Sequence, residues 1–143
     1  MVQLVRLSDQ PPEGFETLMA LASDEGHRNM ARLADELSTG SMTFIALLAA
    51  ISEGDLAGIG GMTLEPEPAL EPAIRMRRLY VAPGFRRTGV ARSVVSALLN
   101  EAWDQVDLVT VHAGTADAGQ FWEAQGFSKV EGAPWTHQAR RSG

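Results

Sequence analysis

Two adjacent arginines and a glycine stand in the most informative segment of the chain, Arg86-Arg87-Thr88-Gly89-Val90-Ala91. Pro83 ends the apolar strand before this segment, and the helical spacing of apolar residues begins at about Gly89. Unpaired backbone N–H groups at such a turn, together with the dipole of the following helix, attract anions. Gly89 lets a ligand approach the backbone, and the two arginines add positive charge. The segment therefore predicts a site for a pyrophosphate group.

A second motif, Ala118-x-x-Phe121-Trp122-x-x-x-Gly126-Phe127, follows a short apolar strand further along the chain. The Arg-x-x-Gly-x-Ala pattern that begins at Arg86 resembles the acyl-CoA signature of the GNAT family of N-acetyltransferases. The second motif resembles a helix of the same family, Ala-x-x-Phe-Tyr-x-x-x-Gly-Phe. The resemblance extends over about residues 73–127 and is diffuse before them. Two motifs in the family's order, each in a strand and helix context, are much more specific than either alone.

The resemblance implies a binding mode for acetyl-CoA as cosubstrate. Its diphosphate would contact the backbone N–H groups of residues 87–91, and its pantetheine would lie along the end of the strand Ala73–Val81. That strand and residues 108–113 would splay apart, with the thioester in the opening and a backbone N–H near residues 79–81 stabilising its oxyanion. The residues expected to contact acetyl-CoA are Leu79, Tyr80, Val81, Arg86, Arg87, Thr88, Gly89, Val90, Ala91, Phe121 and Trp122.

The reaction implied by the resemblance is direct attack of a neutral amine on the thioester carbon. In this family a tyrosine commonly gives the leaving sulfur its proton, and Trp122 occupies that place. The indole N–H is a hydrogen-bond donor and not a usable acid. The sulfur would leave as a thiolate, which a thiol pKa of about 8.5 permits, or take its proton from water. The family's asparagine before this helix is also missing, with Thr115 near its place.

No residue stands out as the general base that would deprotonate the amine. Glu71 lies just before one central strand and His112 near the end of its neighbour, so either could act through a water in the cleft. A plain structural role is the competing interpretation for both, because nothing in the sequence ties either to that task. A substrate amine that arrives already deprotonated is the third alternative.

Three arginines fall in one predicted strand, where period-two alternation puts Arg75 and Arg77 on one face and Arg78 on the other. The first two either recognise an anionic group of the substrate or form a charged face over solvent. The polar residues 24–28, between two predicted helices, are either acceptor contacts or a solvated loop.

Length and composition exclude several classes of protein. The 143 residues fit a single domain, residues 1–143. A net charge of −6 argues against a nucleic-acid partner. The chain has no cysteine, which excludes disulfides and thiolate catalysis, and His27 and His137 lack ligand spacing, so we expect no metal. Neither a signal peptide nor a membrane-spanning run is apparent, so we expect a cytoplasmic protein without a membrane partner.

The pattern of apolar residues predicts the elements that position these groups. Strands are expected at residues 2–7, 43–51, 56–64, 73–81 and 108–113, with strand or hairpin in 129–140. Helices are expected near residues 15–22, 30–37, 90–103 and 118–125, the last ending at a left-handed Gly126. This order predicts an α/β fold with a mixed, mostly antiparallel central sheet and helices on both faces. The resemblance adds a splayed, V-shaped acyl-CoA cleft.

The leading hypothesis is an N-acetyltransferase that acts on a small amine, an amino acid or a peptide terminus, as a monomer or homodimer. The alternative is a catalytically degenerate acyl-CoA-binding or regulatory module of the same fold, which Trp122 and the absence of a clear base favour. An interaction protein without the cosubstrate is a third hypothesis, and the pyrophosphate segment argues against it.

Overall fold

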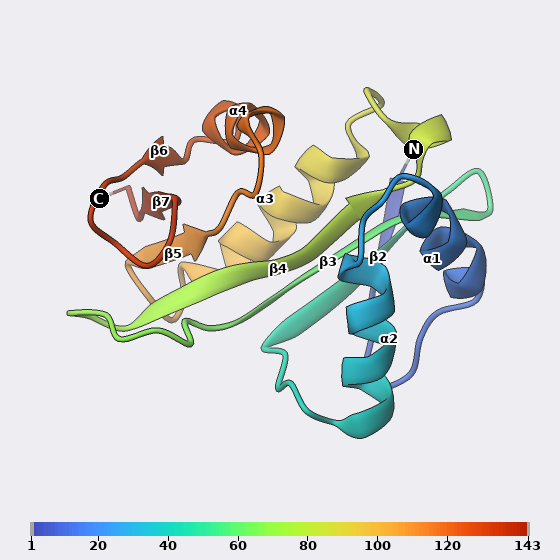
Figure 1. Ribbon diagram of the computed structural model, residues 1–143, viewed down its shortest axis with the longest axis horizontal. Helices are drawn as coiled ribbons and strands as arrows, with labels where there is room; N and C mark the ends of the chain where they lie inside the picture. Colours follow the sequence, from blue (N-terminus) through green and yellow to red (C-terminus); the bar gives the residue numbers. More distant parts are fainter. Residues whose placement is uncertain (1, 143) are drawn as a thin grey trace.

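The computed structural model describes residues 2–142, and these form one seven-stranded sheet and four α-helices (Figure 1). The strand order is β1-β2-β3-β4-β5-β7-β6, and every neighbouring pair is antiparallel except β4 and β5, which are parallel. The predicted mixed, mostly antiparallel sheet is therefore confirmed. The strands are β1 Val2–Arg6, β2 Ala46–Ser52, β3 Asp55–Leu64, β4 Ala73–Val81, β5 Leu108–Val111, β6 Ser128–Lys129 and β7 His137–Arg140.

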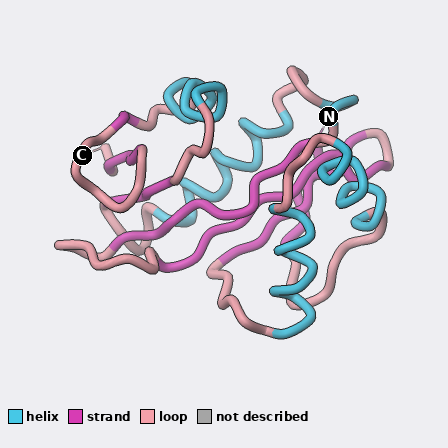
Figure 2. Tube along the Cα trace, viewed as in Figure 1, coloured by secondary structure: helices cyan, strands magenta, loops and turns pink. Residues whose placement is uncertain are grey.

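Helices cover both faces of the sheet, as the sequence predicts (Figure 2). On one face, Leu18 and Leu33 of the first two helices pack in a core with Leu47 of β2. On the other face, Val94 of the third helix and Trp122 of the fourth belong to a second core. Alternating side chains of the strands feed the two cores, because successive residues of a strand point to opposite faces. The helices are α1 Phe15–Asp24, α2 Asn29–Thr39, α3 Val90–Ala102 and α4 Ala116–Ala124.

Several boundaries differ from the sequence prediction, three of them as follows. The strand expected from residue 43 begins at Ala46. The strand expected through residue 113 ends at Val111, and the N–H of Ala113 donates instead to Thr136 Oγ1, at 2.8 Å. α4 begins two residues earlier than expected because Thr115 caps it, with its Oγ1 accepting from the N–H of Ala118 at 3.1 Å.

The end of α4 confirms the predicted left-handed Gly126 and forms a Schellman cap. Gly126 has a φ of 96°, in the left-handed region that favours glycine. Its N–H donates to Glu123, and the N–H of Phe127 donates to the carbonyl of Trp122, at 3.1 Å each. The rings of Trp122 and Phe127 then meet edge to face, with centroids 5.1 Å apart. This cap fixes the helix that carries Trp122.

The two parallel strands separate along their length. β4 pairs with β5 only from Ala73 opposite Leu108 to Arg75 opposite Thr110. β4 continues to Val81, and an irregularity in its pairing with β3 falls where Arg78 adopts a φ of 57°. A bulge of this kind bends a strand and changes its direction. The divergence of β4 from β5 opens the V-shaped gap in which the candidate site lies.

Candidate active site

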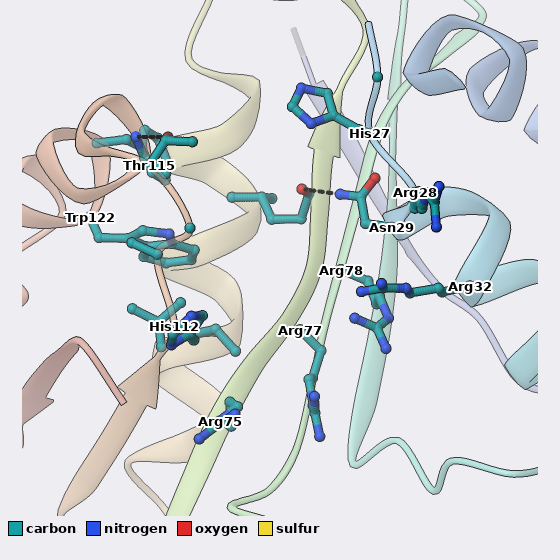
Figure 3. Close-up of a pocket in the computed structure, with 18 residues that line it drawn as sticks. His27, Arg28, Asn29, Arg32, Arg75, Arg77, Arg78, His112, Thr115 and Trp122 are labelled. Atoms are coloured by element: carbon teal, nitrogen blue, oxygen red, sulfur yellow. Dashed lines mark hydrogen bonds between the residues drawn. The ribbon is translucent and has the colours of Figure 1, made fainter. Parts of the chain in front are cut away.

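A cleft of about 720 Å³ occupies the gap between β4 and β5 (Figure 3). The start of α2 forms one wall, β4 forms the floor, and the end of β5 with α4 forms the opposite wall. Its lining residues are Gly26, His27, Arg28, Asn29, Arg32, Arg75, Met76, Arg77, Arg78, Leu79, Val111, His112, Ala113, Gly114, Thr115, Ala118, Phe121 and Trp122.

The carbonyl of Leu79 is tied to α2. Asn29, the first residue of that helix, donates from Nδ2 to this carbonyl at 3.2 Å. The Oδ1 of Asn29 is buried and has no hydrogen-bond partner within residues 2–142. Because a buried acceptor without a donor is unfavourable, the amide group of Asn29 is poised for one more contact.

The opposite wall is aromatic. Trp122 is 6% exposed, and its ring lies edge to face with that of Phe121, with centroids 5.2 Å apart. Both line the cleft, together with the exposed His112 at the end of β5. Figure 3 shows His112 and Trp122 on this wall, across the cleft from His27 and Asn29.

The two candidate bases lie in different places. His112 lines the cleft. Glu71 precedes the start of β4, at the end of that strand away from Leu79, and its carboxylate accepts from Arg140 at 3.1 Å. Glu71 is not among the residues that line the cleft.

The cleft is strongly cationic in a protein of net charge −6. Five arginines and two histidines line it, and no aspartate or glutamate does. Two of these arginines bind carboxylates that do not line the cleft. Arg75 binds Glu65 at 2.8 and 3.0 Å, and Arg78 binds Glu36. Glu65 also accepts from Thr110 of β5 at 2.6 Å, at the point where the two strands begin to part.

The predicted pyrophosphate segment forms an exposed turn before α3. After a short 3₁₀ turn, Pro83–Phe85, Arg87 and Gly89 take left-handed φ values of 64° and 87°. A Cβ added at Gly89 would meet nothing within 4 Å, so the backbone there faces open space. α3 starts at Val90 with Gly89 as its N-cap, and left-handed turns at a helix start present N–H groups to anions. This turn lies outside the residues that line the cleft.

The comparisons with known proteins agree with this architecture. The Acetyltransferase (GNAT) family profile matches residues 6–127. The chain belongs to the GNAT acetyltransferase family. Among proteins of curated function, no sequence matches the chain significantly.

Solved structures share the fold of this GNAT chain. A protein of Exiguobacterium sp. 255-15 assigned as an acetyltransferase has a TM-score of 0.85 and 24% identity, over 98% of this chain and 93% of the other. The Escherichia coli GNAT protein YhbS, solved with CoA, has a TM-score of 0.69 and 16% identity, over 97% and 81%. A mutant AtaT toxin, solved with the C-terminus of its antitoxin AtaR and acetyl-CoA, has a TM-score of 0.73 and 15% identity, over 97% and 92%. At these identities the likeness concerns the fold.

In this GNAT chain the first arginine of the signature is engaged by a carboxylate. Arg86 donates to Glu25 at 2.6 and 2.8 Å, and its guanidinium lies 5.5 Å from the ring centroid of Tyr80. The phenol of Tyr80 donates to the same carboxylate at 2.5 Å. The hydrogen bonds from Arg86 and then Tyr80 lower the pKa of Glu25 from 4.5 to about 2. Burial and then the Glu25 hydrogen bond raise the pKa of Tyr80 to about 12.

The remaining residues of the predicted acetyl-CoA set fall into three groups. Leu79, Phe121 and Trp122 line the cleft. Tyr80, Val81 and Val90 are buried in the cores. Arg86, Arg87, Thr88 and Ala91 lie in or beside the exposed turn, where Thr88 Oγ1 donates to the carbonyl of Phe85.

Sequence reasoning missed Asn29, Arg32 and the role of Glu25. Asn29 and Glu25 have partners that are distant in the sequence, and no local spacing marks Arg32. His137 also has a carboxylate partner, Glu123 at 2.8 Å, and this pair joins the buried imidazole of β7 to the exposed carboxylate of α4. Within residues 2–142, no group of three potential ligands could hold a metal ion, and none of the helices there combines the length and apolar character needed to cross a bilayer.

Proposed function

We propose that this protein transfers the acetyl group of acetyl-CoA to a primary amine of a small molecule, an amino acid or a peptide. The observation that carries the proposal is the cleft that opens where β4 and β5 part, beyond Arg75 and Thr110. Family membership supports the type of reaction. The cytoplasmic location and the monomeric or homodimeric state remain predictions from the sequence.

The residues present fit a CoA diphosphate. The left-handed Arg87 and Gly89 leave backbone N–H groups exposed at the start of a 13-residue helix, and Gly89 has open space above it. Residues 86–91 contain no acidic side chain that would repel a diphosphate. The charge of Arg86 is balanced by Glu25, so we assign the main attraction to the backbone and to Arg87. Leu79, Phe121 and Trp122 would border the pantetheine and acyl end.

Bound acetyl-CoA supplies an acetyl group activated as a thioester. The nitrogen of the neutral amine forms a bond to the carbonyl carbon, and the carbon–sulfur bond breaks. The nitrogen loses one proton and the sulfur leaves as thiolate or thiol, so the products are an acetamide and CoA. A backbone N–H at the bulge near residues 79–81 would donate to the carbonyl oxygen as its negative charge develops.

We assign the proton from the amine to His112 in preference to Glu71. His112 lines the cleft, whereas Glu71 is bound to Arg140 at the far end of β4. A neutral imidazole within reach of the amine, directly or through one water, can act as its general base. Trp122 cannot protonate the sulfur, so water or departure as thiolate completes the reaction.

The second candidate function is an acyl-CoA-binding or regulatory module. Trp122 in the place of the usual tyrosine, and a cleft lining without a carboxylate, favour it. Two measurements separate the hypotheses. Acetyl-CoA must raise the melting temperature if either is correct, because a ligand that binds only the folded state stabilises it.

Thiol release from acetyl-CoA across a panel of amines then decides between catalysis and binding. Release with at least one amine, with the acetamide found by mass spectrometry, supports the enzyme. A raised melting temperature with no thiol release across the panel supports the module. No change in melting temperature at saturating acetyl-CoA contradicts both.

A further inference from the structure

The α2 wall of the cleft and the adjoining β4 floor carry positive charge that the protein does not neutralise. We call Arg28, Arg32 and Arg77 the arginine wall. All three line the cleft, and none forms an ion pair with a carboxylate of residues 2–142. The protein as a whole carries a net charge of −6, so carboxylates are plentiful elsewhere.

Arg77 lacks a carboxylate partner, whereas its two arginine neighbours on β4 are both paired with carboxylates. Arg75 binds Glu65 and Arg78 binds Glu36, each through two hydrogen bonds. Arg77 donates only from Nε, to Thr63 Oγ1 at 3.2 Å. Its two terminal nitrogens make no hydrogen bond within residues 2–142, although the side chain is half-buried.

The surroundings of Arg77 also disfavour an isolated charge. Burial lowers the pKa of Arg77, and the charges of Arg75 and Arg78 lower it further. Arginine nevertheless stays protonated in proteins, so an anion that reaches the half-buried guanidinium of Arg77 would stabilise it. Its planar pair of terminal nitrogens matches the two oxygens of a carboxylate or phosphate.

The other two members of the arginine wall come from α2. Arg28 caps this helix and Arg32 lies one turn later on the same side, where both face the cleft. Both arginines also border a neighbouring hollow, together with Asp35 and Glu36 of α2. Glu36 is bound by Arg78, and neither Arg28 nor Arg32 forms an ion pair with Asp35. Figure 3 shows Arg32 and Arg77 on the same side of the cleft, across from His112 and Trp122.

We propose that the acceptor amine also carries an anionic group, a carboxylate or a phosphate, which Arg77 and Arg32 bind, with Arg28 adding charge at the rim. This inference rests on the proposed function and names the class of acceptor. The anion on the arginine wall would turn the amine toward His112 and the aromatic wall. A neutral amine of the same length would lack this anchor.

The test uses matched pairs of amines in the thiol-release assay. β-Alanine is compared with its amide, a dipeptide with the C-terminally amidated dipeptide, and 2-aminoethyl phosphate with ethylamine. We expect kcat/KM to be about tenfold or more higher for the anionic member of a pair, as expected for charge-assisted hydrogen bonds. The carboxylate and phosphate pairs show which anion is preferred.

Two variants locate the effect. Arg77→Gln and Arg32→Gln should each lower kcat/KM for anionic acceptors about tenfold, mainly through KM, and leave neutral acceptors unchanged. Arg141→Gln is the control, since Arg141 is exposed outside the cleft, 3.9 Å from Asp107. An unchanged acetyl-CoA-induced rise in melting temperature shows that each variant is folded. Arg77 is half-buried, and its replacement could disturb packing. Arg32 is exposed, so Arg32→Gln tests the anion site without that effect.

Equal rates for charged and neutral partners, or an equal loss for both in the variants, would overturn the inference. If no amine is acetylated, the proposed function fails, and the anion site is judged by binding. β-Alanine and 2-aminoethyl phosphate should then raise the melting temperature in the presence of CoA more than their neutral partners do, and Arg77→Gln should abolish the difference. No such rise in the wild-type protein rejects the anion site.

Discussion

Glu25 and Arg86 join the loop after α1 to the turn before α3 through two hydrogen bonds, of 2.8 and 2.6 Å. The first residue flanks the α1–α2 connection that borders the cleft, and the second begins the candidate diphosphate segment. Two regions that would hold different substrates are thereby coupled by one ion pair. Its partners titrate far from neutral pH, so the pair is intact under ordinary conditions.

Replacing Glu25 by Gln should weaken the dependence of the free energy of unfolding on pH between 4.5 and 2. The pKa of Glu25 is lowered from 4.5 to about 2 by Arg86 and Tyr80, so its contribution is complete above pH 4.5 and lost as pH falls toward 2. The difference in free energy of unfolding between wild type and Glu25→Gln should therefore shrink over this range. Denaturant melts at several pH values measure it, with the exposed Glu13→Gln as the control. A difference that does not change with pH contradicts the assignment.

Tyr80 should ionise at a higher pH than an ordinary tyrosine. The chain has one tyrosine, so the phenolate absorbance of the native protein reports this residue alone. Burial and Glu25 raise its pKa from 10.0 to about 12, so the folded state retains a proton that the unfolded state loses. Stability should accordingly fall as pH rises from 10 to 12. A spectrophotometric midpoint near 10 in the folded protein would contradict this, and Tyr80→Phe supplies the blank.

Gly89→Glu should abolish acetyl-CoA binding. The substitution places a carboxylate in the open space where the diphosphate is expected, and it strains a φ of 87°. Gly89→Asn separates these effects, because asparagine tolerates the left-handed region without adding charge. Calorimetric titration should show no binding to the Glu variant and weakened binding to the Asn variant. Wild-type affinity in a folded Gly89→Glu protein would reject the diphosphate site.

Trp122→Tyr should preserve or raise turnover. The phenol would restore a proton donor on the aromatic wall of the cleft, whereas the indole cannot act as an acid. Because Trp122 is 6% exposed and packs on Phe127, the smaller ring should also lower stability, by about 1 kcal/mol. Thiol-release rates and melts measure both, and Trp122→Phe, which lacks the hydroxyl, is the comparison. A large loss of rate in a folded Tyr variant would reveal a role for the indole.

Thr115→Ala should destabilise α4 by about 1 kcal/mol, because it removes the acceptor for the N–H of Ala118. Thr115→Ser should retain most of the stability. Denaturant melts of the three proteins measure the effect. Equal stability of the Ala variant and wild type would mean that water replaces the cap.

Local patterns explain why much of the fold could be predicted. β4 follows a proline-rich loop and ends before Pro83, so both of its bounds are marked in the sequence. Gly126 and Phe127 mark the end of α4 in the same way. The start of α4 was misplaced because the spacing of apolar residues shows where a helix packs, while its first turn is set by the Thr115 cap.

The site was only partly predictable, because its key contacts join distant positions. Asn29 and Leu79 are 50 residues apart, and Glu25 and Arg86 are 61 apart, so no spacing rule connects them. The alternation of β4 placed Arg75 and Arg77 on one face but could not show that Glu65 engages only the first. The position of Glu71 before a central strand likewise gave no sign of Arg140.

The short pairing between β4 and β5 has a consequence for local stability. Three residue pairs hold the strands together, and the backbone of β4 beyond Arg75 lacks a neighbour on that side. On the sheet, the residues after 107 are thus joined to β4 only by this short edge, next to the hydrogen bond between Thr110 and Glu65. A molecule bound in the gap would contact both strands, so amide protons of β5 and β7 should exchange more slowly with solvent deuterium in the loaded protein than in the empty one.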